Sequence, residues 1–208
     1  MHGIELLKKR NVLRYALTAL RNNPSIMEFG ASRDFGSTKL ISDLALKTNS
    51  SVKLVDPNQE TLTNAINSVE DEIKLKTFCS KGEDLEIEFF KDIGLFHLDG
   101  FDIVTSHPHK KTTLEDYRKN GIDLIKDGNV LSAESHLRIS TKIVDASENN
   151  PCIIIFDDTW AYKGIWYGKG ATAVPFLISH GFSLISKPSR NPFLFFRYKW
   201  GVALYRTY

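Results

Sequence analysis

The feature that most constrains the fold of this chain is an alternation of short apolar runs with stripes of apolar residues at helical spacing. The runs "SIMEF" (25–29) and "SVKLVD" (51–56) are typical of buried strands. Apolar residues recur every three or four positions in the segments 13–20, 40–45 and 62–69. Pro24 ends the first of these stripes, because proline cannot continue a helix. The alternation predicts an α/β fold, with a doubly wound, mostly parallel sheet covered on both faces.

The same pattern continues into the second half of the chain. We expect the third, fourth and fifth strands at "KTFCS" (76–80), "FDIVTSH" (101–107) and "PCIIIFDD" (151–158), and a helix in the apolar run from 89 to 98.

The pattern is least regular in residues 118–150. We expect two helices there, broken near Gly128, with a short strand at "NVLS" (129–132) as the alternative. The end of the chain has a different character. The segments "FSLISK" (182–187) and "FLFFRYKW" (193–200) are rich in strand-forming residues, which predicts an antiparallel pair that closes the sheet at its edge.

No repeat, low-complexity tract or linker divides the chain, so we expect one domain over residues 1–208. Its expected parts are an N-terminal helix (1–24), a ligand-binding core (25–187) and a C-terminal edge strand with a tail (188–208). With 208 residues, of which 42% are hydrophobic, the chain is long enough to bury a substantial core.

Charge and cysteine content narrow the class of protein further. The 27 basic and 25 acidic residues leave a net charge of +2, which argues against nucleic acid or a membrane surface as the partner. Cys79 and Cys152 lie far apart in a chain that needs no disulfide, so we expect free thiols and a cytoplasmic protein. The N-terminal segment mixes charged and apolar residues, unlike a signal peptide or a membrane span. Whether the chain forms a homo-oligomer stays open.

The stretch "SIMEFGASRDFGST" (25–38) carries two glycines directly after the first expected strand. In parallel sheets, ligands bind beyond the carboxyl ends of the strands, so a glycine turn here predicts a binding site. A dinucleotide fingerprint needs a second glycine two positions after Gly30, and alanine, serine and arginine stand there instead. A phosphate-binding loop of the Walker type needs a lysine after Gly36, and Ser37 occupies that position.

What remains is a glutamate, a glycine, five residues and "GST" before a helix, then a second strand that ends in Asp56. This arrangement resembles the class I S-adenosylmethionine-dependent methyltransferases, particularly the small-molecule branch with the catechol-type and macrolide-sugar O-methyltransferases. The resemblance spans roughly residues 25–187 and implies a Rossmann-like fold with a cofactor-binding core.

The resemblance also implies a set of cofactor-binding residues. The turn after the first strand passes under the methionine part of the cofactor, and Asp56 accepts hydrogen bonds from the ribose hydroxyls. "SKGEDLE" follows the third strand, where the family contacts the adenine. The full set consists of Glu28, Gly30, Ala31, Gly36, Ser37, Thr38, Asp56, Gly82, Glu83, Asp84 and Ser106.

Asp157 and Asp158 form an acidic pair directly after the apolar fifth strand. In the catechol-type branch, such a pair joins an acid after the fourth strand to hold a divalent cation. The expected fourth strand ends at Ser106 and His107, so that acid is missing and metal binding stays open, with Asp157 and Asp158 as the ligands if a metal is used.

The same loop offers a base, since His107 and His109 flank Pro108 at the expected acceptor site and histidine accepts protons near neutral pH. We therefore expect His107, His109 and Asp157 to be catalytic. Aromatic residues crowd the segment after the fifth strand and are suited to wall a flat or sugar-like acceptor. The expected acceptor-binding residues are Asp158, Trp160, Tyr162, Trp166 and Tyr167.

The sequence thus predicts an S-adenosylmethionine-dependent methyltransferase that acts on a small-molecule acceptor, by O-methylation, with transfer to carbon or nitrogen as the alternative. Two alternatives stay open. An RNA methyltransferase would use the basic and aromatic segment 190–208 as its RNA platform, and a non-catalytic domain would keep the fold for partner binding.

Overall fold

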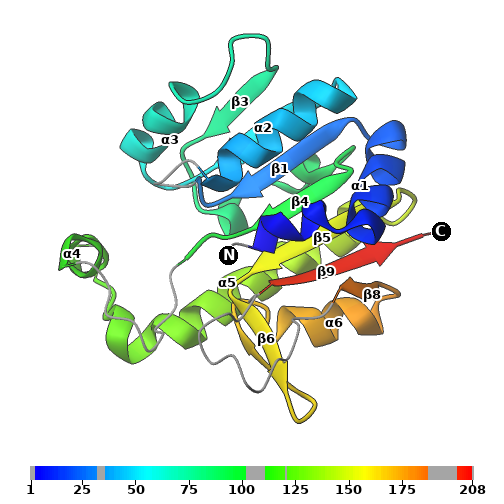
Figure 1. The fold of residues 1–208 in the computed structure, drawn as a ribbon. Helices are drawn as coiled ribbons and strands as arrows, with labels where there is room; N and C mark the ends of the chain where they lie inside the picture. The colour runs from blue at the N-terminus through cyan, green and yellow to red at the C-terminus, as the bar shows by residue number, and fades with distance from the viewer. Residues whose placement is uncertain (1–2, 32–35, 102–110, 120, 187–200, 208) are drawn as a thin grey trace.

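A computed structural model describes residues 3–31, 36–101, 111–119, 121–186 and 201–207 of the chain. Its main sheet has seven strands in the order β3-β2-β1-β4-β5-β9-β8 (Figure 1). These strands are β1 (Ser25–Phe29), β2 (Ser51–Val55), β3 (Leu75–Phe78), β4 (Leu95–Leu98), β5 (Cys152–Asp157), β8 (Ser183–Ser186) and β9 (Gly201–Arg206). Strands β1 to β5 pair in parallel, and β9 is antiparallel to both β5 and β8. The predicted α/β, Rossmann-like class is confirmed.

Helices cover both faces of this sheet. The α-helices are α1 (Arg10–Asn22), α2 (Gly36–Thr48), α3 (Gln59–Ile66), α4 (Lys111–Lys119), α5 (Leu124–Ala146) and α6 (Ala173–Ser179). Short 3-10 helices are η1 (Gly3–Lys8), η2 (Gly82–Asp84) and η3 (Ile87–Phe90). The helical stripes predicted in the first third of the chain correspond to α1, α2 and α3, and the Asn58 side chain caps α3 by accepting from two backbone amides.

The core consists of two apolar layers, one on each face of the sheet. Ile153 and Ile155 of β5 pack in the layer that contains η1, α1 and α2, whereas Ile154 and Phe156 pack in the layer that contains α5 and α6. Burial on both faces explains why these strands are continuous apolar runs in the sequence. In the described chain, no helix has the combination of length and apolar character that crossing a bilayer requires.

The fourth strand is not where the sequence analysis placed it. The strand between β1 and β5 is β4 (Leu95–Leu98), within the run that we expected to be helical. All four residues of β4 are buried, so the run lacks the polar alternation by which a half-exposed strand is recognised. Of the expected strand 101–107, only Phe101 lies within the described residues, and its φ of 57° is left-handed.

The expected helix break near Gly128 is also wrong. Residues Leu124–Ala146 form one helix of 23 residues that passes through Gly128, which is buried. The interruption comes earlier, at Gly121, whose φ of 74° is incompatible with a right-handed helix. Asp123 then caps α5 by accepting hydrogen bonds from the amides of Ile125 and Lys126.

At the C-terminus, the last strand lies inside the sheet. Strand β9 (Gly201–Arg206) is inserted between β5 and β8, so β8 (Ser183–Ser186) forms the edge. The predicted strand 182–187 is therefore found as β8. Its expected partner, the segment 193–200, lies outside the described residues.

Candidate active site

Acidic side chains stand at the carboxyl ends of four adjacent parallel strands. Glu28 is the fourth residue of β1, Asp56 follows β2, Asp99 follows β4 and Asp157 ends β5. The strand order reverses between β1 and β4, because the chain runs outward from β1 to β3 and returns on the other side. The carboxyl edge at such a reversal is where open α/β sheets bind ligands.

The glycine turn after β1 is in backbone contact with the turn after β4. Gly30 has a φ of 83°, and a Cβ atom at this position would lie 2.7 Å from the carbonyl oxygen of Asp99 and 2.7 Å from the amide nitrogen of Gly100. Only glycine fits, both for its conformation and for this close approach. The next residue, Ala31, donates its amide to Asp56 Oδ2 at 3.2 Å. The turn thus brings the ends of β1, β2 and β4 together.

Asp56 lies at the carboxyl edge of the sheet and stabilises this turn through hydrogen bonds. Besides Ala31, its carboxylate accepts the amide of Asn58 at 2.8 Å, and the residue is only partly buried. Gly36, Ser37 and Thr38 begin α2 on the far side of residues 32–35, which lie outside the described chain. The predicted turn residues and Asp56 are therefore brought into one neighbourhood.

Glu28 is fully buried beneath the turn. One carboxylate oxygen accepts from Thr38 Oγ1 at 2.9 Å, and the other lies 3.1 Å from His97 Nδ1. Burial alone would lower the pKa of His97, but its hydrogen bond to Glu28 and the charge of that carboxylate outweigh burial and raise the pKa. Glu28 thus ties the start of α2 to β4.

The predicted adenine-contacting residues lie in η2, after β3. A Cβ atom on Gly82 would lie 2.5 Å from the Phe29 ring, so a side chain here would have to displace that ring. Glu83 accepts from Ser135 of α5 at 2.7 Å, and Lys142 donates to the Glu83 carbonyl at 2.6 Å. Asp84 is exposed. Of the three residues, Gly82 and Glu83 therefore have packing roles in the fold.

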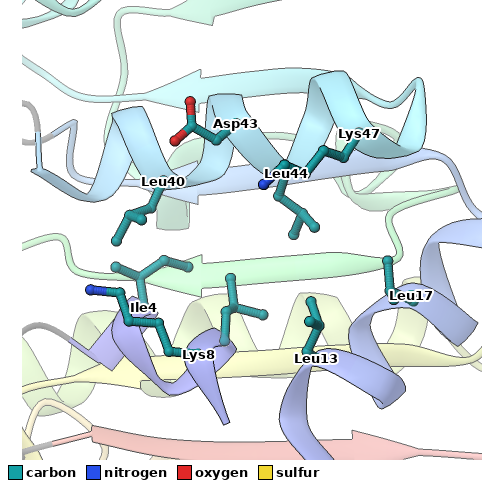
Figure 2. Close-up of a pocket in the computed structure, with 9 residues that line it drawn as sticks. Ile4, Lys8, Leu13, Leu17, Leu40, Asp43, Leu44 and Lys47 are labelled. Atoms are coloured by element: carbon teal, nitrogen blue, oxygen red, sulfur yellow. The ribbon is translucent and has the colours of Figure 1, made fainter. Parts of the chain in front are cut away.

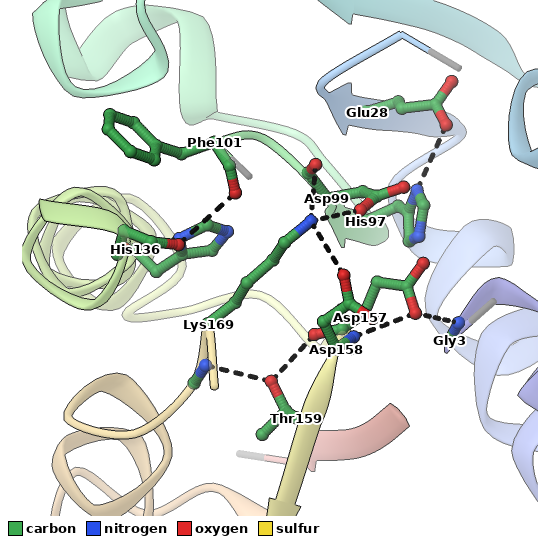
Figure 3. A network of polar contacts seen from close by, with 12 residues as sticks. Gly3, Glu28, His97, Asp99, Phe101, His136, Asp157, Asp158, Thr159 and Lys169 are labelled. Atoms are coloured by element: carbon green, nitrogen blue, oxygen red, sulfur yellow. Dashed lines mark hydrogen bonds and ion pairs between the residues drawn. The ribbon is translucent and has the colours of Figure 1, made fainter. Parts of the chain in front are cut away.

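The acidic pair after β5 lies beside Asp99 and is held by the backbone. Asp157 Oδ1 accepts the amide of Gly3 at 2.6 Å and that of Asp158 at 2.9 Å (Figure 3). Asp158 has a left-handed φ of 42°, which is uncommon for a residue with a side chain. Backbone strain of this kind is concentrated at functional sites.

Lys169 reaches into the middle of this cluster (Figure 3). Its ammonium nitrogen lies 2.5 Å from Asp99 Oδ1, 3.0 Å from the Asp99 carbonyl and 3.4 Å from Asp158 Oδ2, and its side chain is 3% exposed. Burial by itself would lower the pKa of Lys169, but the charges of Asp99, Asp158 and Asp157 outweigh it and raise the pKa. Burial raises the pKa of Asp99 to about 6 against the opposing effect of Lys169. At neutral pH the two groups form a buried ion pair.

The premise that the fourth strand lacks an acid is therefore wrong, because Asp99 stands at its end. Ligand atoms of His97, Asp99 and Asp157 lie within 4.8 Å of one another, a spacing that could hold a metal ion. A divalent cation would bind a carboxylate oxygen of Asp99 at about 2.0–2.6 Å. The Lys169 ammonium group already lies 2.5 Å from Asp99 Oδ1 and would repel a second cation there. With Lys169 in this position, the described residues do not fit a metal ion.

The aromatic segment after β5 forms a hairpin outside the main sheet, made of β6 (Thr159–Tyr162) and β7 (Ile165–Gly168). Lys163 and Gly164 both have positive φ, as in the tight turns that join two strands. Trp160 and Tyr167 are cross-strand partners and their rings stack, with centroids 6.0 Å apart. Of the other two rings, Tyr162 is 50% exposed, whereas Trp166 packs against the α5 and α6 layer.

The predicted bases His107 and His109 lie outside the described residues, as does Ser106, which was predicted to contact the cofactor. Within the described chain, another histidine, His136 of α5, is fully buried near the cluster (Figure 3). Its Nδ1 lies 2.7 Å from the Ser132 carbonyl, and burial, followed by the charge of Lys169, lowers its pKa to about 3. His136 is therefore neutral at physiological pH.

A separate groove of about 370 Å³ is lined by η1, α1 and α2 (Figure 2). Most of its lining residues are leucines, and Lys8, Asp43 and Lys47 also line it. None of the predicted site residues lines it, so it is distinct from the polar cluster at the carboxyl edge.

The sequence analysis missed three residues of the cluster: His97, Asp99 and Lys169. His97 and Asp99 were hidden by the misplaced fourth strand. The signal that would have found Asp99 is an acid at the end of the apolar run "GLFHL", similar to the acids at or near the carboxyl ends of β1, β2 and β5. For Lys169, the signal is its position between Gly168 and Gly170.

No protein-family model and no curated protein matches the chain. Similar folds occur among solved structures. OxaC, crystallised with S-adenosylhomocysteine (SAH) and oxaline, is 13% identical with a TM-score of 0.55; the match covers 99% of this chain and 47% of OxaC, so the chain spans about half of that protein. SMU.1697c from Streptococcus mutans, provisionally described as a methyltransferase and also bound to SAH, is 11% identical with a TM-score of 0.51, over 95% of this chain and 97% of its own.

A third similar structure is the N-methyltransferase NodS from Bradyrhizobium japonicum WM9 in complex with SAH. It is 9% identical with a TM-score of 0.50, and the match covers 97% of this chain and 91% of NodS. At these identities the likeness establishes the fold, which is the Rossmann-like fold of the S-adenosylmethionine (SAM)-dependent methyltransferases.

Proposed function

We propose that this chain is a SAM-dependent methyltransferase that methylates an oxygen of a small-molecule acceptor. The observation that carries the proposal is the contact between the Gly30 turn, Asp56 and the turn at Asp99, at the point where the strand order reverses. The same fold binds SAH in OxaC, SMU.1697c and NodS.

The residues at this edge fit the chemistry of the cofactor. Asp56 is partly exposed at the end of β2, and a carboxylate there can accept two hydrogen bonds from a ribose diol. The methionine part of the cofactor is assigned to the turn after β1 and the start of α2, that is, to Gly30, Ala31, Gly36, Ser37 and Thr38. Ser106 is assigned to the same site. Glu28 is buried beneath the turn and would hold it in place by accepting the hydrogen bond from Thr38. Gly82, Glu83 and Asp84 would border the adenine.

When bound, SAM supplies a methyl group to a nucleophile by direct displacement, so the protein has to align the two reactants and remove a proton. We assign proton removal to His107 or His109 and the orientation of the acceptor to Asp157 and Asp158. The aromatic hairpin would form one wall of the acceptor site, through Trp160, Tyr162, Trp166 and Tyr167. The stack of Trp160 on Tyr167 supports this assignment, since it presents a rigid aromatic surface beside Asp158.

The test is methyl transfer from radiolabelled SAM to a panel of catechols, phenols and sugars, with ribosomal RNA as the competing substrate. We expect label in a base-stable ether of a small molecule and none in RNA. His107→Ala or His109→Ala should lower turnover at least tenfold without changing the affinity for SAH. His180→Ala, at the exposed end of α6, serves as the control. Labelled RNA, or full turnover in both histidine variants, would contradict the proposal.

A further inference from the structure

The metal ion that the catechol-type resemblance implies does not fit beside Lys169, and this disagreement leads to an inference about the lysine itself. We propose that Lys169 is a built-in cation that takes the place of a divalent metal ion in this site. Its consequence for catalysis, methyl transfer without a metal, rests on the proposed function, whereas its consequence for metal binding does not.

The backbone around Lys169 directs the lysine into the cluster. Gly168 has a φ of 80°, and a Cβ atom on it would lie 1.8 Å from the Asp158 carbonyl. Lys169 donates its own amide to that same carbonyl at 3.2 Å, and Gly170 donates its amide to Thr159 Oγ1 at 2.9 Å. The segment Gly168–Gly170 is thus fixed against the residues that follow β5.

The cluster around the ammonium group of Lys169 contains side chains that can act as ligands of a cation. Asp99 and Asp158 contact Lys169 directly, and Asp157 lies close to Asp99. His97 is fully buried, and among the described residues its Nε2 has no hydrogen-bond partner. Figure 3 shows His97 between Glu28 and the carboxylates of Asp99 and Asp157. Without Lys169, the Asp99 carboxylate would lose the cation that contacts it, and a buried charge that loses its partner is strongly destabilising.

Lys169 and a divalent cation would therefore compete for the same carboxylates. A second cation beside the ammonium group would be repelled by it, in surroundings where charges are weakly screened. Removing the lysine should thus convert the cluster into a metal site with oxygen and imidazole ligands, a set that Mn²⁺ accepts.

The experiment is a calorimetric titration of MnCl₂ into the native protein and into Lys169→Ala. The native protein should bind no Mn²⁺ at concentrations up to about 1 mM. Lys169→Ala should bind one equivalent, with an affinity at least tenfold tighter than this limit. Lys169→Ala/Asp99→Asn should lose this gained binding. Lys91→Ala, which removes an exposed lysine paired with Glu88 at the surface, should behave as the native protein does.

Two results would overturn the proposal: stoichiometric Mn²⁺ binding by the native protein that Asp99→Asn abolishes, or a folded Lys169→Ala that binds no Mn²⁺. If Lys169→Ala folds only when Mn²⁺ is present, the proposal is supported. Lys169→Met, which nearly keeps the volume of the side chain, provides a second variant for the same titration. If neither variant folds, the titration of the native protein decides. Because SAH binding is measured separately, a failure here is distinguishable from a failure of the proposed function.

Discussion

At the scale of single residues, the conformation of the carboxyl edge depends on Gly30. A side chain there would meet the backbone of Asp99 and Gly100, which cannot move as a flexible side chain could. The turn that is proposed to hold the cofactor and the loop after β4 are thus built as one unit.

Gly30→Ala tests this dependence. We expect it to lower the free energy of unfolding by about 2–4 kcal/mol, from the left-handed φ and from steric overlap with the backbone. Gly121→Ala is the matched control, because Gly121 has a similar φ of 74° but no described atom within 4 Å of its Cβ position, so about 1–2 kcal/mol should be lost. Urea denaturation measures both. Equal losses in the two variants would show that the contact with Asp99 is not constraining.

His136 predicts a pH dependence of stability. Its pKa is about 3 in the folded chain, lowered by burial and by Lys169, against about 6.5 in an unfolded chain. Between these values the unfolded chain binds a proton that the folded chain does not, so stability falls as the pH drops below about 6.5, by up to about 1.4 kcal/mol per pH unit. Above about pH 6.5, His136 is neutral in both the folded and the unfolded chain, so it adds no further pH dependence to the stability.

Urea denaturation at pH 7, 6 and 5 checks the prediction. The native protein should lose more stability on acidification than His136→Leu, in which the buried imidazole is absent. Lys169 and His97 face His136 in both proteins, so their contributions cancel in the comparison. The exposed His180→Leu should follow the native curve. Parallel curves for the native protein and His136→Leu would rule out a neutral, buried His136.

At the scale of elements, strands with a distinctive pattern could be predicted and the fourth strand could not. Strands β1, β2 and β5 are apolar runs that end in acids or lead into turns, and the sequence placed all three. Strand β4 is buried on both faces and follows the apolar η3, so its residues resemble one longer apolar helix. The glycines were misleading too, because Gly128 lies inside α5, whereas the break between α4 and α5 is at Gly121.

The misplaced strand also explains why part of the site was missed. With the fourth strand expected at 101–107, Asp99 could not be placed at a strand end, and the acidic cluster was incomplete. Lys169 is adjacent in space to Asp99 but 70 residues away in sequence. Such a contact depends on the tertiary arrangement of β4 and the hairpin, which local patterns do not contain.

At the scale of the whole molecule, the sheet order places all four acidic strand ends on one edge. The two apolar layers fix the strands from both sides, and the N-terminal η1 closes the end of β5 through the bond from Gly3 to Asp157. The site is thus assembled from segments that span the chain from Gly3 to Gly170, so its geometry depends on the complete fold.

The most direct test of the central claim, that this edge holds SAM, is calorimetric titration of the protein with SAH, and separately with NAD. We predict one SAH site and no binding of NAD. Asp56→Ala should weaken SAH binding about 10- to 150-fold, the loss expected for a charge-assisted hydrogen bond of about 1.5–3 kcal/mol. Asp71→Ala, which removes an exposed carboxylate before β3, should leave the affinity unchanged. Binding of NAD without SAH, or unchanged SAH affinity in a folded Asp56→Ala, would contradict the account.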